Sequence, residues 1–143
     1  MDSNTLLMSV QDKLPKDSFE LQGFKERLDR LDEKARDELM AKIPLLKLKS
    51  PSLVFWVGSF LFGNFGVGRF MIGDMVLGGA RLAITLLALI FSAIAQEGGS
   101  STASVIGGLC VLVMWIWWIA DLFLVGKKLR KTNLNTLLLA LPQ

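Results

Sequence analysis

Apolar and polar residues alternate in two different ways along this chain. Up to about residue 49, apolar side chains recur three or four positions apart among charged ones, which is the spacing of an amphipathic helix. From Leu53 to Val125 three long apolar blocks follow, and only five ionisable side chains interrupt them: Arg69, Asp74, Arg81, Glu97 and Asp121. Since a helix needs about 20 apolar residues to cross a bilayer, this middle region predicts helices embedded in a membrane.

The N-terminal region predicts two amphipathic helices. Apolar positions at helical spacing indicate a short helix over residues 2–14, which Pro15 ends. Asp17, followed three residues later by Glu20, fits a capping box, so a second helix is expected to begin there. Its apolar stripe continues at three- and four-residue steps until Pro44 ends the helix.

The apolar stripe of this second helix needs something to pack against. It keeps heptad register for only about two repeats, which is shorter than a coiled coil requires. One interpretation is that it packs on the short neighbouring helix or on the membrane region. The other is that it forms a partner face, used by another protein or in self-association. The residues of this partner face are Leu21, Phe24, Leu28 and Leu31.

The three apolar blocks differ in length. Ser50 and Pro51 form a typical helix start, but the block from Leu53 to about Phe65 is too short to cross a bilayer without including Arg69. The other two blocks, residues 75–95 and 102–125, are each long enough to span the membrane. We therefore expect one short helix followed by two spanning helices.

The distribution of charge predicts the topology. Residues 1–50 carry ten basic and ten acidic side chains, residues 127–131 carry four basic ones, and the loop at residues 96–101 carries no basic residue. Because cytoplasmic loops are enriched in Lys and Arg, both ends of the chain are expected in the cytoplasm. This requires an even number of crossings, so the first block enters the membrane and returns, or lies obliquely. The alternative is three full crossings with the N-terminal region outside.

These observations predict an all-α membrane protein, with a short re-entrant or oblique helix and a two-helix transmembrane hairpin. Three regions follow. Residues 1–49 form a cytoplasmic amphipathic helical region, residues 50–129 a membrane domain, and residues 130–143 a short cytoplasmic C-terminal tail. With 52% hydrophobic residues and a mean hydropathy of +0.47, the chain is more apolar than a soluble domain of its length. A multi-pass location in a bacterial inner membrane is expected.

Four charged residues lie inside the apolar region, where an isolated charge costs about 2.5–3.5 kcal/mol on insertion scales. Arg69 and Asp121 fall on the cytoplasmic side in this topology, so we expect them to pair. Asp74 and Arg81 offer a second pair or an exchange of partners. The Arg69 guanidinium is also able to donate to backbone carbonyls freed by a nearby helix break. The alternatives to a structural role are an ion or proton path and a site for a ligand or a lipid headgroup.

The glycine-rich stretch between the first two blocks predicts a sharp break in the helix. Glycine permits positive backbone torsions and a close approach of helices. The glycines concerned are Gly63, Gly66, Gly68 and Gly73. The stretch does not fit a phosphate-binding loop, because no strand precedes it and no Gly-Lys-Ser or Gly-Lys-Thr follows.

The chain resembles the TM2 domain family over residues 50–129. The resemblance rests on glycines leading into Arg69 and Phe70, a glycine three residues on, an apolar helix, and tryptophan shortly before an aspartate. These elements are Gly63, Gly66, Arg69, Phe70, Gly73, Gly78, Gly79, Trp117, Trp118 and Asp121. Met71 stands where the family commonly has tyrosine. The resemblance implies a small membrane domain and leaves both the N-terminal third and the activity unspecified.

The inventory of reactive side chains argues against catalysis. The chain has no histidine, and its one cysteine, Cys110, lies within an apolar block, so no catalytic residues, metal ligands or cofactor site are expected. The basic cluster is too narrow for a nucleic-acid footprint. The expected partners are the lipid bilayer and either a protein partner or a second copy. We expect a non-enzymatic integral membrane interaction or accessory protein. The alternatives are a small oligomeric channel or transporter and an immunity or defence-type protein that engages a toxin.

Overall fold

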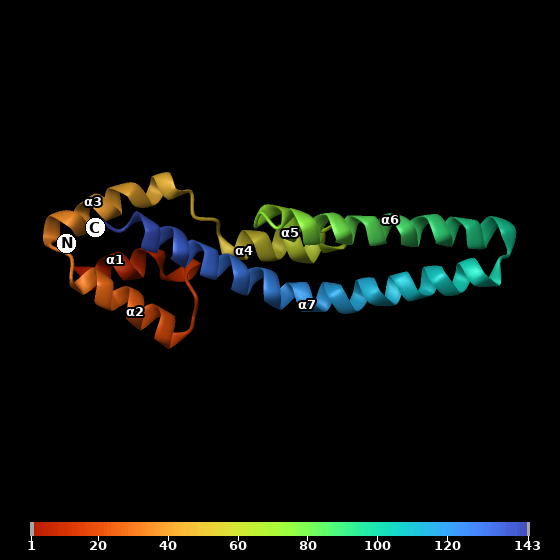
Figure 1. Ribbon diagram of the computed structural model, residues 1–143, viewed down its shortest axis with the longest axis horizontal. Helices are drawn as coiled ribbons and strands as arrows, with labels where there is room; N and C mark the ends of the chain where they lie inside the picture. The colour runs from red at the N-terminus through yellow and green to blue at the C-terminus, as the bar shows by residue number, and fades with distance from the viewer. Residues whose placement is uncertain (1, 143) are drawn as a thin grey trace. The chain divides into compact units, whose positions relative to one another are not determined.

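The computed structural model describes residues 2–142, and the secondary structure in this range is helical, with no strand. Figure 1 shows the order of the helices along the chain. The all-α prediction is therefore confirmed. The chain divides into two compact units. The head unit comprises the residues up to Pro51 and those from Lys127 onward, and the hairpin unit comprises Ser52–Gly126.

The head unit is built from short helices around one apolar core. Its elements are α1 (Ser3–Val10), the 3₁₀ turn η1 (Gln11–Lys13), α2 (Ser18–Asp29), α3 (Glu33–Lys42), the 3₁₀ turn η2 (Ile43–Leu46) and the C-terminal part of α7 (Ser101–Ala140). The core side chains come from all four α-helices and from Leu14. They are Leu6, Val10, Leu14, Phe24, Leu28, Leu39, Leu134 and Leu137. The short helix predicted over residues 2–14 is confirmed.

The single long helix predicted from Asp17 to Pro44 is wrong, because the structure breaks it into α2 and α3. The Asp32 side chain caps α3 by accepting a hydrogen bond from the Ala35 backbone N–H at 2.8 Å. The Arg36 guanidinium donates to the carbonyl oxygens of Leu28 at 3.0 Å and Asp29 at 3.2 Å, at the end of α2. The charged positions around residue 32 are thus a helix boundary and not merely a solvated face.

The start of α2 is predicted correctly, although by half of the expected motif. The Asp17 carboxylate accepts a hydrogen bond from the Phe19 backbone N–H at 3.0 Å, as an N-cap residue does. Glu20, expected to reach back to the N-cap backbone, instead pairs with Lys131 at 3.6 Å. The reciprocal capping box is therefore replaced by one cap and one ion pair to α7.

Residues 130–140, which we expected in a short tail, lie in α7 and pack in the head unit. Figure 1 shows this end of α7 beside the N-terminal helices. The Arg130 guanidinium donates to the carbonyl oxygens of Asp12 at 2.8 Å and Leu14 at 2.9 Å. The basic cluster therefore includes a side chain that holds the loop after η1, in addition to any attraction it has for anionic headgroups.

Asn133 connects two further segments of the head unit. Its buried side-chain amide donates to the carbonyl oxygens of Lys13 and Lys49, each at 3.0 Å. Lys13 is the last residue of η1, and Lys49 lies between η2 and α4. Asn133 thus fixes the end of η1 and the segment before α4 to the same turn of α7.

The predicted partner face is used within the chain. Phe24 and Leu28 are 1% and 0% exposed, in contact with the core. Leu21 and Leu31 are half-buried and pack against the same core. Of the two interpretations of the apolar stripe, the structure favours intrachain packing, because all four residues belong to the core of the head unit or pack against it.

The hairpin unit contains the first block, the glycine-rich break and two long helices. Its elements are α4 (Pro51–Leu53), the π-helix η3 (Val54–Leu61), the 3₁₀ turn η4 (Gly63–Phe65), α5 (Val67–Met71), α6 (Met75–Gly98) and α7. The first block is helical as predicted, but most of it is π-helix. Glu97, expected in the polar loop, lies in the last turn of α6.

Two helices, α6 and α7, are long and apolar enough to cross a membrane. In the most apolar window of each, only 22% of α6 and 11% of α7 is buried. A core helix of a soluble protein buries most of its apolar surface, so these outward-facing side chains call for an apolar surrounding. This agrees with the two spans predicted from the second and third blocks.

Candidate functional site: a buried charge cluster

The glycine-rich break has two residues in the left-handed region of backbone space. Gly66 has a φ of 74° and Gly73 a φ of 82°. A residue with a Cβ is strained there, so glycine is required by conformation at both positions. These two residues bracket α5, which therefore turns sharply at both ends before α6 begins.

The other glycines of the break allow backbones to approach each other. A Cβ on Gly68 would lie 2.6 Å from the Ser59 hydroxyl, and one on Gly58 would lie 2.8 Å from the Gly68 Cα. A Cβ on Gly63 would lie 2.8 Å from the Trp118 ring. No real Cβ contact is that short, so α5 packs on η3, and the break packs on α7, only because side chains are missing here.

Arg69, on α5, lies between two carboxylates. Its Nη2 and Nε donate to Asp121 Oδ1 on α7, at 2.5 and 3.0 Å. Its Nη1 donates to Asp74 Oδ2 at 3.2 Å, just before α6 begins. The predicted pairing of Arg69 with Asp121 is present, and Asp74 joins it on the other side of the guanidinium.

Arg81, on α6, shares the same aspartate. Its Nη1 donates to Asp121 Oδ2 at 3.2 Å, and its Nη2 donates to the Met114 carbonyl oxygen at 3.4 Å. The guanidinium carbon lies 5.7 Å from the centre of the Trp117 ring, within the range of a cation–π contact. Asp121 therefore connects α5 and α6 to α7 through one carboxylate.

The four charged residues form a cluster with two positive and two negative charges. Arg81 is 1% exposed, Asp121 3% and Arg69 6%, and Asp74 is half-buried. Arg69 lies outside the two long apolar helices. Burial lowers its pKa, but the hydrogen bonds and charges of Asp121 and Asp74 outweigh burial and raise the pKa above its ordinary value. The Arg69 guanidinium thus stays cationic, and its charge is neutralised by protein groups.

Two further residues satisfy the backbone at the break. Trp118 belongs to the tryptophan–aspartate motif noted in the sequence, whereas Thr85 was not singled out there. The Thr85 hydroxyl donates to the Asn64 carbonyl oxygen at 2.5 Å, and Trp118 Nε1 donates to the Ser59 carbonyl oxygen at 2.9 Å. Arg69 is also able to donate to freed carbonyls, but its hydrogen bonds go to carboxylates. The one sequence hint to Thr85 is its hydroxyl, one helical turn after Arg81 on α6.

The contacts of this cluster are structural in kind. They connect α5, α6 and α7 at one point, beside a break whose carbonyls are satisfied from α6 and α7. Two buried atoms, Ser59 Oγ and Arg81 Nε, have no hydrogen-bond partner in the described chain. Among residues 2–142, no three His, Cys, Asp or Glu side chains are grouped closely enough to hold a metal ion.

No protein-family model, curated protein or solved structure matches the chain. The resemblance to the TM2 domain family therefore rests on the motif residues alone.

Proposed function

We propose that the chain is a non-enzymatic integral membrane accessory protein, in which the hairpin unit is the anchor and the head unit engages another protein. The single observation that carries this proposal is the closed charge cluster. Each of its four ionisable residues pairs with another of the four. Residues that neutralise one another within the chain serve to hold the anchor together, and this leaves the head unit as the part able to meet a partner.

The same observation argues against the channel or transporter alternative. An ion path needs charged groups that face water, and intramembrane charges that conduct line a wet cavity. Here Arg81 and Asp121 are almost fully buried by protein. Their polar side-chain contacts are with each other, with Arg69 and with the Met114 carbonyl, and the Trp117 ring lies over the Arg81 guanidinium.

The proposed topology has two full crossings, by α6 and α7, with both chain ends in the cytoplasm. Its support is the length of the first helical block. α4 and η3 contain 3 and 8 residues. At about 1.5 Å per residue these cover roughly half of a hydrocarbon core of about 30 Å. A segment of this length enters one leaflet or lies obliquely, as a TM2-like domain would have it.

The partner-binding role is tested by photo-crosslinking in cells. A photoreactive residue at Phe19, which is 82% exposed on the head unit, should yield one crosslinked protein in a fixed ratio. The same residue at Leu39, which is 0% exposed in the core of the head unit, is the buried control and should yield none. A Phe19 probe that captures nothing above the Leu39 background would contradict the accessory role.

Reconstitution tests the alternative. Purified protein in planar bilayers should show no conductance above that of a variant with Arg81 and Asp121 both replaced by apolar residues. Ion currents that depend on these two residues would favour the channel or transporter over the accessory protein.

A further inference from the structure

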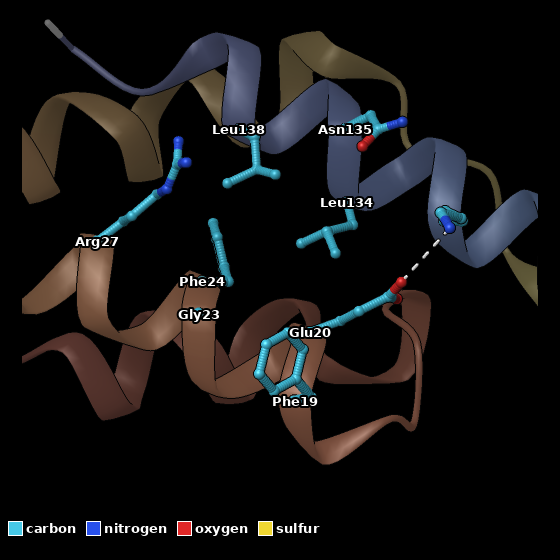
Figure 2. A pocket seen from close by; sticks show the side chains of 9 residues that line it. Phe19, Glu20, Gly23, Phe24, Arg27, Leu134, Asn135 and Leu138 are labelled. Atoms are coloured by element: carbon cyan, nitrogen blue, oxygen red, sulfur yellow. Dashed lines mark ion pairs between the residues drawn. The ribbon is translucent and has the colours of Figure 1, made fainter.

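We propose that the head unit binds an acidic amphipathic segment of its partner in a groove between α2 and the C-terminal end of α7, an inference that rests on the proposed function and specifies the partner's chemistry. The α2/α7 groove is defined by Phe19, Phe24, Arg27, Lys131, Leu134 and Leu138. Figure 2 shows Phe24, Leu134 and Leu138 pointing toward one another across it, with Arg27 at one side and Phe19 at the other.

The floor of the groove is apolar and continues into a second hollow. The first hollow has a volume of about 270 Å³. The second, of about 450 Å³, shares Arg27 and Leu138 with the first and adds Arg30 and Leu139. An amphipathic helix that lies in a groove buries apolar side chains from successive turns. Two adjoining open hollows provide a place for each of two such side chains. The first is smaller than most small-molecule sites, so it is better matched to a side chain than to a drug-sized ligand.

Two large apolar side chains stand exposed beside these hollows. Phe19 is 82% exposed and Leu139 is 87% exposed. Phe19 lines the first hollow and Leu139 the second. Exposed aromatic and aliphatic side chains around a concave apolar floor are typical of a protein-binding surface.

The charge of the groove specifies the occupant. Arg27 lies in the last turn of α2 and Arg30 is its C-cap residue, still in helical conformation, so the two side chains, three residues apart, project from the same face. Both are exposed, and neither has an ion pair with any residue in the part of the chain that the structure describes. Glu20 is the one acidic residue that lines either hollow, and it is already paired with Lys131. The free guanidinium groups therefore favour a partner segment with Asp or Glu beside its apolar face.

The test uses the full chain in lipid nanodiscs and a labelled synthetic peptide that forms an amphipathic helix, with leucine along one face and glutamate on both flanks. Fluorescence anisotropy should show saturable binding that weakens with added salt. The Arg27→Gln/Arg30→Gln variant should bind about tenfold more weakly, since two exposed charge contacts are lost. A peptide with lysine in place of glutamate should not bind.

Matched controls separate the groove from the net charge of the molecule. Lys34→Gln/Lys42→Gln removes two exposed basic residues from α3, which does not line the groove, and should leave the affinity unchanged. Phe19→Ser should weaken binding without altering the circular dichroism spectrum, because Phe19 is exposed in the fold. Equal binding by the glutamate and lysine peptides, or equal loss in both double variants, would overturn the proposal.

Other occupants give distinguishable results. Dimerisation in nanodiscs that the Arg27→Gln/Arg30→Gln variant abolishes would assign the groove to a second copy and overturn the proposal. So would competition of the peptide by anionic lipid in the nanodisc, which would assign the groove to a membrane surface. If the Phe19 crosslink succeeds in cells but the acidic peptide does not bind, the inferred chemistry fails while the accessory role stands. If both fail, the proposed function fails with it.

Discussion

At the scale of single residues, the hairpin unit depends most on Asp121. The Asp121 carboxylate accepts hydrogen bonds from both Arg69 and Arg81, and Asp74 accepts one from Arg69. Removing one member of a buried ion pair leaves an uncompensated charge, which is more costly than the pair itself is favourable. Loss of Asp121 is therefore expected to reduce stability more than loss of Asp74.

Asp121→Ala should destabilise the protein by about 3–5 kcal/mol, because it leaves two buried guanidinium groups without their carboxylate. Asp74→Ala should cost much less, about 1 kcal/mol, since Arg69 keeps Asp121. Thermal unfolding in detergent, followed by tryptophan fluorescence, measures both. Glu97→Ala, at an exposed position at the end of α6, is the control and should have no effect. An Asp121→Ala variant as stable as the parent would show that the cluster does not hold the fold.

The glycines give a second residue-scale prediction. Gly66→Ala should destabilise by about 1–3 kcal/mol, because its φ is 74° and the new Cβ would lie 2.6 Å from the Gly78 carbonyl oxygen. Gly79→Ala is the matched control, because nothing lies within 4 Å of its Cβ position. The same melting assay compares the two. Equal melting temperatures would mean that the break tolerates a side chain.

At the scale of elements, helical periodicity predicts faces well but not breaks. The apolar positions Leu28, Leu31 and Ala35 keep their three- and four-residue steps across the end of α2, so the stripe looked like one helix. The break is made by polar groups, the Asp32 cap and the Arg36 side chain, whose effect depends on hydrogen bonds that a periodicity does not encode. That α6 and α7 are long and apolar enough to cross a membrane was predictable, because length and composition alone decide it.

In the charge cluster, too, one contact could be predicted from the sequence and another could not. The pairing of Arg69 with Asp121 was predictable, because buried opposite charges on one side of a membrane need each other. The sharing of Asp121 by Arg81 was not, because it depends on how closely α6 approaches α7 at residues 40 positions apart. Asn133 was missed for a similar reason, since its partners are carbonyls far away in the sequence.

Asn133 gives the prediction that belongs to the element scale. Asn133→Ala should destabilise the head unit by about 1–3 kcal/mol, because it removes the two buried hydrogen bonds to the carbonyls of Lys13 and Lys49. Limited proteolysis should then cut the head unit faster than in the parent. Asn135→Ala, two residues along α7 at an exposed position, is the matched control and should be cut at the parental rate. Equal rates of cleavage for all three proteins would show that Asn133 does not stabilise the head unit.

At the scale of the whole molecule, the proposed membrane anchor is the hairpin unit, whose buried charges pair with one another, and the proposed binding groove lies in the head unit. Each unit has its own core or cluster, and α7 contributes to both. The outward-facing apolar side chains on α6 and α7 would be unfavourable in water and are stabilised when lipid surrounds them. The central claim is therefore that α6 and α7 cross a bilayer, with both ends of the chain on the same side.

Cysteine accessibility in intact cells tests this claim most directly. In a Cys110→Ser background, single cysteines are introduced as Lys16→Cys, Asn135→Cys and Glu97→Cys, all at exposed positions. A membrane-impermeant maleimide added from outside should label the Glu97→Cys variant alone, and the other two should react only after the cells are opened. Labelling of Lys16→Cys from outside, with Asn135→Cys protected, would show an odd number of crossings. Recovery of the protein in the soluble fraction would contradict the membrane anchor itself.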